Sequence, residues 1–127
     1  MSGYVLDTGV VIRHLRGKKQ FVSLLRGLGK SNRLAISSVT RLEIFAGVRE
    51  GEIYQTRKLL SRFVNFAVDE EIAERAGFLV ARSRERGRLI LVADAIVAAT
   101  AIVNQADLVT LNRGDFELIS SLRLYEF

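Results

Sequence analysis

The sequence predicts an α/β fold in which helices cover both faces of a short parallel sheet. Three observations support this prediction. Short apolar runs that suit buried strands alternate with longer helical patterns along the chain. The composition, 49% hydrophobic and 26% charged, is that of a folded globular protein. The 127 residues contain no proline, repeat or linker-like stretch, so residues 1–127 are expected to form one domain.

The first third of the chain predicts one strand and two helices. Residues 4–6 are a short apolar run, which is consistent with a buried strand. Residues 8–16 and 18–29 have helical patterns, and the two helices are separated by a break near Gly17.

A second strand and two more helices are expected next. The strand covers residues 34–36, and either Ser37 or Ser38 can then cap a helix over roughly residues 39–49. Residues 52–62 give the other helix. The apolar stripe expected on the first of these helices consists of Val39, Leu42, Phe45 and Ala46.

The second half continues the alternation with a third strand over residues 63–68. Residues 69–86 begin with acids and end in arginines, an order that suits a helix dipole, and Gly87 ends this helix. The apolar stretch 89–103 is shorter than the roughly 18 residues of a membrane span, so it predicts a buried helix instead. This helix is expected over residues 92–104. The last two strands are expected over residues 108–111 and 122–125.

Four carboxylates lie where apolar segments end: Asp7, Glu43, Asp94 and Asp115. In a parallel sheet, ligands collect at the carboxyl ends of the strands, and these positions place all four acids near one such edge. Carboxylates that converge repel one another unless a cation lies between them. A divalent metal ion removes that repulsion and can activate water for attack on phosphorus.

Each acid also has an ordinary structural explanation. Asp7 can cap the helix that follows it, and Asp94 can be a first-turn residue favoured by the helix dipole. Glu43 can pair with a neighbouring arginine, and Asp115 can be a turn residue. The four positions together favour a shared site over four separate explanations.

Composition restricts the metal. Without cysteine and with His14 as the single histidine, a thiolate or imidazole-rich site is excluded, and oxygen ligands indicate Mg²⁺ or Mn²⁺. His14 is expected on a helix surface with no part in catalysis. Two other phosphate-binding motifs are excluded. Gly29-Lys30-Ser31 resembles the end of a Walker loop, but the glycine that this loop requires is replaced by Leu24. Asp7 could begin the DxD motif of aspartyl-phosphate phosphatases, but its second aspartate is replaced by Gly9.

The net charge of +5 is unevenly spread. Residues 1–62 carry 12 Lys/Arg against 4 Asp/Glu, a balance of +8, and residues 63–127 carry 7 against 10, a balance of −3. This distribution fits a polyanionic partner, although basic side chains can equally serve to solvate helix faces. The arginines expected to bind such a polyanion are Arg13, Arg16, Arg82 and Arg86.

Four stretches in order resemble the PIN-domain family, and most closely its VapC-type toxin ribonucleases. They are VLDTGVVI, ISSVTRLEIFAGV, ADAIVAATA and LVTLNRGDFELI, and together they span essentially the whole chain. The resemblance implies a three-layer α/β/α sandwich around a short parallel sheet. The family often has a proline shortly before its third acid, where this chain has Leu91-Val92-Ala93.

The resemblance also implies roles for single residues. Asp7, Glu43, Asp94 and Asp115 match the catalytic acids, and Asp7, Asp94 and Asp115 match the metal ligands. Glu43 is expected to bind a second ion or to orient the attacking water. Polar positions that support the site match Thr8 and Asn112, and less directly Thr110.

The expected activity is therefore Mg²⁺- or Mn²⁺-dependent hydrolysis of RNA by the toxin of a toxin–antitoxin pair. The implied partners are RNA, a second copy of the chain and an antitoxin that covers the acidic site. The apolar helices of residues 8–62 offer surface for both protein contacts, unless their apolar positions are all core. No leader or membrane span is recognised, which predicts a cytoplasmic protein. A non-catalytic RNA- or protein-binding module and an RNA-processing nuclease without an antitoxin are the alternatives.

Overall fold

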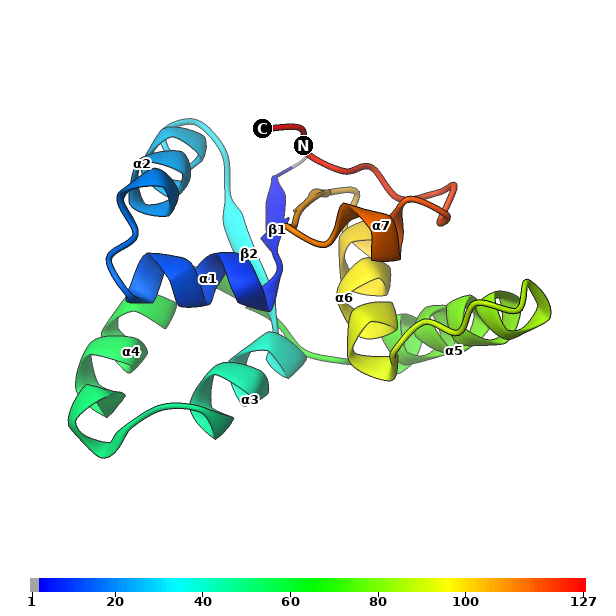
Figure 1. The fold of residues 1–127 in the computed structure, drawn as a ribbon, viewed down its shortest axis with the longest axis horizontal. Helices are drawn as coiled ribbons and strands as arrows, with labels where there is room; N and C mark the ends of the chain where they lie inside the picture. Colours follow the sequence, from blue (N-terminus) through cyan, green and yellow to red (C-terminus); the bar gives the residue numbers. More distant parts are fainter. Residues whose placement is uncertain (1–2) are drawn as a thin grey trace.

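The computed structural model describes residues 3–127, and its centre is a four-stranded parallel sheet (Figure 1). The strand order is β3-β2-β1-β4, and every neighbouring pair is parallel, which confirms the predicted α/β class. In chain order the strands are β1 Tyr4–Leu6, β2 Leu34–Ser37, β3 Val64–Phe66 and β4 Asp107–Val109.

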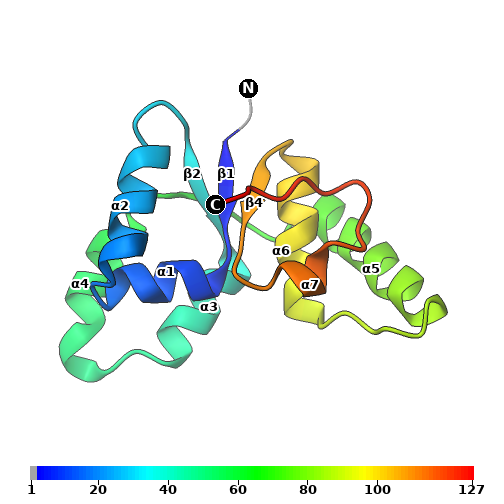
Figure 2. The ribbon, with the colours of Figure 1, turned by 45° about the horizontal axis from the view of Figure 1, so that its top comes forward.

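The strands send alternate side chains to opposite faces of the sheet, and both faces are buried. On one face, Leu6, Ile36 and Val109 join a core cluster. Three helices cover this face: α1 Thr8–Leu15, α2 Lys19–Leu28 and α4 Ile53–Leu60. They lie together on one side of the sheet in both ribbon views (Figures 1 and 2).

The other face is covered by α6, the alanine-rich helix Val92–Val103, and by the short helix α7, Arg113–Phe116. Val5, Ala35 and Leu108 point into this second core. The long helix α5, Glu70–Glu85, packs on the outside of α6 rather than on the sheet. Helices thus lie on both sides of the sheet, and the α/β/α arrangement is confirmed.

Helix α3, Ser38–Ala46, follows β2, and the short turn η1, Glu50–Glu52, leads on to α4. Ser37 caps α3, because its side chain accepts a hydrogen bond from Val39 N at 3.1 Å. The predicted apolar stripe on this helix is only partly correct. Val39 and Phe45 pack against the cores, but Leu42 is 64% exposed, and the buried residues are Thr40 and Ile44. Gly47 ends the helix three residues earlier than expected.

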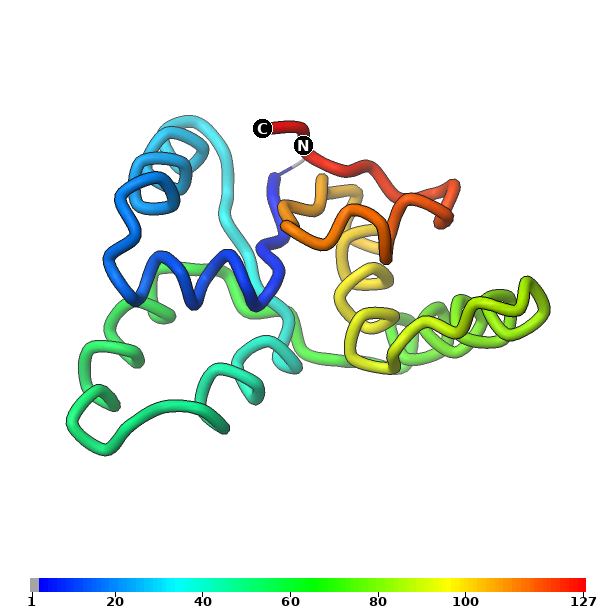
Figure 3. Tube along the Cα trace, viewed as in Figure 1, coloured from blue at the N-terminus to red at the C-terminus, as the bar shows by residue number. Residues whose placement is uncertain are grey.

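Helix α5 begins and ends as its sequence predicts. The Asp69 carboxylate accepts a hydrogen bond from Ile72 N at 2.9 Å. Gly87 has a φ of +75°, the left-handed conformation in which glycine commonly ends helices. Residues 86–91 then run back alongside α5, as the chain trace shows (Figure 3).

Two further expectations need correction. Residues 122–125 do not form a strand, because only one isolated bridge, between Leu108 and Leu124, joins them to the sheet. The stretch 89–103 is buried only in part, since three of the four apolar residues at its start, Leu89, Leu91 and Val92, are 64–70% exposed. Within residues 3–127, no helix has both the length and the apolar character needed to span a bilayer.

Candidate active site

Asp7 is placed by the end of β1 at the carboxyl edge of the sheet. Its backbone N–H donates to Val109 O of β4 at 2.9 Å, which continues the pairing of the two strands past Leu6. The residue is 6% exposed and also caps α1, since its Oδ1 accepts from Thr8 N at 2.9 Å. The capping explanation and the convergent placement are therefore both correct for this residue.

The second carboxylate oxygen of Asp7 is held by a residue that was expected to support the site only indirectly. Thr110, buried directly after β4, donates its hydroxyl to Asp7 Oδ2 at 2.7 Å. Burial raises the pKa of Asp7, the bonds from Thr110 and Thr8 lower it, and the charges of Glu43 and Asp115 raise it further. The net result is a pKa above the usual 3.8.

Glu43 reaches the same edge from the second turn of α3 and is exposed. The Thr8 hydroxyl donates to Glu43 Oε1 at 2.5 Å, and the Thr8 and Thr40 hydroxyls are also hydrogen-bonded, at 3.1 Å. Thr40 is fully buried, and its role was not recognised from the sequence. The sequence signal that could have identified Thr40 is its spacing of four residues from Ile44, which places both on the same face of the helix.

Asp94 lies in the first turn of α6 and is half-buried. Burial raises its pKa to about 6, with further contributions from the negative charges of Asp7, Asp115 and Glu43. The fourth acid, Asp115, projects from α7 and is 56% exposed at its side chain. Its carboxylate lies 3.9 Å from Arg88 Nη2, which also donates to Gly114 O at 2.8 Å.

The second supporting residue, Asn112, precedes α7 and contributes through its backbone. Its N–H donates to the Thr110 hydroxyl at 3.0 Å, so it helps to orient the residue that holds Asp7. The Asn112 side chain is exposed and makes no capping bond to α7.

The four acids share one electrostatic field. Asp94 is raised in pKa by the other three, and Asp7 by two of them. Within residues 3–127, however, no three carboxylate or imidazole side chains are grouped closely enough to hold one ion as they stand. The donors are all oxygen atoms, and a cation among them would offset both the burial of these charges and the repulsion that together raise the two pKa values. The residues therefore fit a hard divalent ion.

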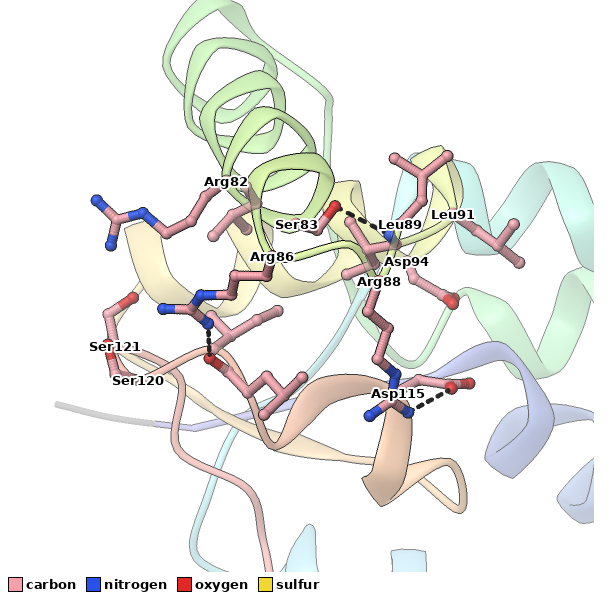
Figure 4. A pocket seen from close by; sticks show the side chains of 14 residues that line it. Arg82, Ser83, Arg86, Arg88, Leu89, Leu91, Asp94, Asp115, Ser120 and Ser121 are labelled. Carbon is pink, nitrogen blue, oxygen red and sulfur yellow. Dashed lines mark hydrogen bonds and ion pairs between the residues drawn. The ribbon is translucent and has the colours of Figure 1, made fainter.

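The arginines considered for RNA binding lie in two places. Arg16 lines a pocket that also contains Glu43, and Arg13 donates to Gly9 O at 3.2 Å while its guanidinium lies 5.8 Å from the Phe21 ring centre. The other two, Arg82 and Arg86, line a pocket that contains Asp94 and Asp115 (Figure 4).

His14 is half-buried rather than on an open helix surface, which corrects the sequence-based expectation. Its Nδ1 is buried without a hydrogen-bond partner among the described residues. Burial and the positive charges of Arg62 and Arg26 lower its pKa, so the imidazole stays neutral. It lies on the α1–α2 side, where it lines a pocket with Arg26 and Arg62.

The chain is similar to known proteins over nearly its full length. Residues 4–121 match the sequence model of the PIN domain. Ribonuclease VapC19 of Mycobacterium tuberculosis is 38% identical over 120 residues, covering 94% of this chain and 96% of that protein. Ribonuclease VapC10 of the same organism is 35% identical over 119 residues, covering 94% and 90%. VapBC2 from Rickettsia felis, solved bound to a DNA fragment from its promoter, has a TM-score of 0.86 at 27% identity, with 98% of both chains covered.

Proposed function

The chain belongs to the PIN-domain family and, within it, to the VapC-type proteins; from this premise we propose that it is a ribonuclease that requires Mg²⁺ or Mn²⁺. We further propose that it is the toxin of a toxin–antitoxin pair. The ribonuclease names of VapC19 and VapC10 support the activity. The whole chain, residues 1–127, is proposed to act as one nuclease domain.

The observation that carries this proposal is the mutual repulsion of the acids. Burial raises the pKa values of Asp7 and Asp94, and the charges of Glu43 and Asp115 raise both further. Such an arrangement destabilises the folded chain unless something positive binds there. A module that only binds protein or RNA gains nothing from it, which favours a metal-dependent enzyme over the non-catalytic alternative.

Asp7, Asp94 and Asp115 are proposed to hold the metal ion, which when bound polarises a phosphate and lowers the pKa of bound water. Thr110 and the Thr8 backbone keep the Asp7 carboxylate in one orientation through bonds of 2.7 and 2.9 Å. Thr8 likewise occupies Oε1 of Glu43, which leaves Oε2 free to accept a proton from the attacking water. Thr8 thus connects Asp7 to the proposed base, because its backbone N–H donates to Asp7 and its hydroxyl donates to Glu43.

RNA is proposed to lie along the basic side chains on either side of these acids. Arg16 shares a pocket with Glu43, and Arg82 and Arg86 share one with Asp94. Arg13 is the fourth candidate, on the exposed side of α1. Their positive charge offsets phosphate repulsion as the strand approaches the acids.

The protein partners proposed are an antitoxin and a second copy of the chain. VapBC complexes among the structural neighbours support the first. For the second, exposed apolar side chains on α5 and at the start of α6, Phe78 at 64% and Val92 at 66%, offer a surface. The helices of residues 8–62 use most of their apolar residues in the core, and Leu42 and Tyr54 are their large exposed ones. The cytoplasm is the proposed location.

An RNA cleavage assay tests the activity. Purified protein is incubated with structured RNAs and Mn²⁺, in parallel with the variant Asp7→Asn and with a chelator. We expect cleavage by wild type, and none by Asp7→Asn or in the presence of the chelator. The matched control is Asp107→Asn, because Asp107 lies at the opposite end of β4, where it pairs with Arg123 at 2.7 Å.

Equal cleavage by wild type and Asp7→Asn overturns the mechanism, and RNA binding without cleavage at saturating Mn²⁺ favours the non-catalytic module. A small neighbouring gene whose product blocks cleavage would support the proposed role as the toxin of a toxin–antitoxin pair. Its absence favours a processing nuclease.

A further inference from the structure

One pocket extends from the acids past Arg82 and Arg86, two of the arginines proposed to bind RNA. It lies between the C-terminal end of α5, the 86–91 segment and residues 118–121, with a volume of about 110 Å³. Asp94 and Asp115 lie at one end of it, and Arg82, Ser120 and Ser121 lie toward the other (Figure 4). We refer to it as the α5–α7 pocket.

The walls of the α5–α7 pocket have two characters. Leu79, Ile90 and Ile119 are half-buried apolar side chains, and Leu118 adds an apolar surface that is 47% exposed. Three arginines, from positions 82, 86 and 88, supply positive charge around these apolar groups. An anion with a flat apolar part fits this combination better than an apolar ligand or a simple ion.

Two of the three arginines are fixed by backbone carbonyl groups across the pocket. Arg86 Nη1 donates to Leu118 O at 2.7 Å, and Arg88 Nη2 donates to Gly114 O at 2.8 Å. These bonds tie the 86–91 segment to the α7 region, so that planar guanidinium groups are held as part of the wall. A base can stack on such a plane without distorting the protein.

Arg82 is different. It is exposed and makes no hydrogen bond or ion pair within residues 3–127, and its guanidinium extends from the end of the pocket farthest from Asp94 (Figure 4). A free guanidinium at this position can bind a phosphate group bidentately. From one end to the other, the pocket thus contains the acids Asp94 and Asp115, a wall on which a base can stack, and the cation of Arg82.

We propose that the α5–α7 pocket binds one unpaired nucleotide of the RNA strand next to the bond that is cleaved. The base lies against the apolar wall and the fixed guanidinium groups, and the phosphate on its far side pairs with Arg82. This inference rests on the proposed ribonuclease function. Because a base inside a duplex cannot enter the pocket, the cleaved bond must lie in a loop, bulge or other single-stranded segment.

Arg82→Gln tests the phosphate contact, and Arg84→Gln is its matched control. Arg84 is equally exposed on the same helix but lines a separate pocket with Val92 and Ile96. Binding of a labelled short oligouridine is measured in Ca²⁺, which limits cleavage, over a range of salt concentrations. We expect the log–log salt slope to decrease by about 0.7 for Arg82→Gln, the value of one lost single-strand phosphate contact, and to stay unchanged for Arg84→Gln. Equal slopes in the two variants overturn the phosphate contact.

Abasic substitutions test the base contact. In an RNA that wild type cleaves at a mapped bond, one abasic nucleotide is moved along the strand. We expect binding to weaken about fivefold or more at one position beside that bond, and the loss to be smaller in Leu118→Ala. No position-specific loss, or cleavage of a fully paired duplex at the same rate, overturns the inference.

Failure of the proposed function gives a different result. If wild type cleaves no RNA, the function fails, and the oligouridine titration still reports on the pocket. If wild type cleaves and Arg82→Gln behaves as Arg84→Gln does, the function stands and the pocket assignment is wrong.

Discussion

Replacing Asp94 with asparagine should stabilise the metal-free protein at neutral pH. The pKa of Asp94 is raised from 3.8 to about 6 by burial and by the charges of Asp7, Asp115 and Glu43. Above that pKa, Asp94 is ionised in both states, but its charge has a higher free energy in the folded chain than in the unfolded chain. Ionised Asp94 therefore lowers the free energy of unfolding. Asparagine has nearly the same shape as aspartate and removes the charge.

The size of the effect follows from the shift. The difference between 3.8 and about 6 corresponds to about 3 kcal/mol at 25 °C. Because Asp94 is only half-buried, water screens part of this energy, and about 1–1.5 kcal/mol is the expected gain. For a chain of this length, such a gain raises the Tm by roughly 3–8 °C.

The assay is thermal or urea unfolding in a chelator at several pH values. A raised carboxyl pKa means that the folded state binds more protons than the unfolded state between about pH 4 and pH 6, so stability falls as pH rises through that window. The advantage of Asp94→Asn should therefore be absent below about pH 4 and complete above about pH 7. Saturating Mn²⁺ should reverse the order by stabilising wild type alone.

Three results would refute this reasoning: a destabilised Asp94→Asn protein at neutral pH, an advantage that does not change with pH, or equal stabilisation of both proteins by Mn²⁺. Glu74→Gln, which neutralises an exposed acid on α5, is the control and should leave stability unchanged.

Three other changes give separate predictions. Thr110→Val removes the hydroxyl that donates to Asp7 Oδ2 and should lower the free energy of unfolding by about 1.5–3 kcal/mol at neutral pH, measured by urea denaturation. Unchanged stability would mean that the bond contributes nothing. Ser37→Ala removes the cap of α3 and should cost about 1 kcal/mol in the same measurement, whereas Ser38→Ala should cost less. Gly87→Ala, at a φ of +75°, should destabilise by about 1–2 kcal/mol, while Gly77→Ala inside α5 should stabilise by about 0.5–1 kcal/mol. Equal effects of the two alanines would contradict the backbone argument.

The acids could be located from the sequence because each interrupts an apolar pattern. Asp7 follows the fully buried Val5 and Leu6 of β1, and Asp94 lies in the first turn of a helix that contains five consecutive buried residues, Val97–Ala101. Once the alternation of strands and helices predicts a parallel sheet, these positions must lie near its carboxyl edge. The ends of α5 were predictable for a similar reason, because Asp69 and Gly87 act through local backbone chemistry.

Features that depend on how elements orient toward one another were not predictable. On α3, two overlapping sets of positions satisfy helical spacing, so the sequence does not decide which of them is buried. The capping bond of Ser37 and the hydrogen bond between Thr40 and Thr8 orient the helix. Thr40 and Ile44 are therefore buried, and Leu42 is exposed. The run 122–125 suits a strand, but β4 beside it has only three residues and supports one bridge. The partial burial of His14 likewise depends on the packing of α1 against its neighbours.

The central claim is that Asp7, Asp94 and Asp115 hold a divalent cation at the carboxyl edge of the sheet. Crystals soaked in Mn²⁺ and measured at the manganese absorption edge test it most directly, because the anomalous signal locates each ion. We expect one or two ions among these three carboxylates, with the Thr110 bond to Asp7 retained. Manganese bound elsewhere, or none at a saturating concentration, would contradict it.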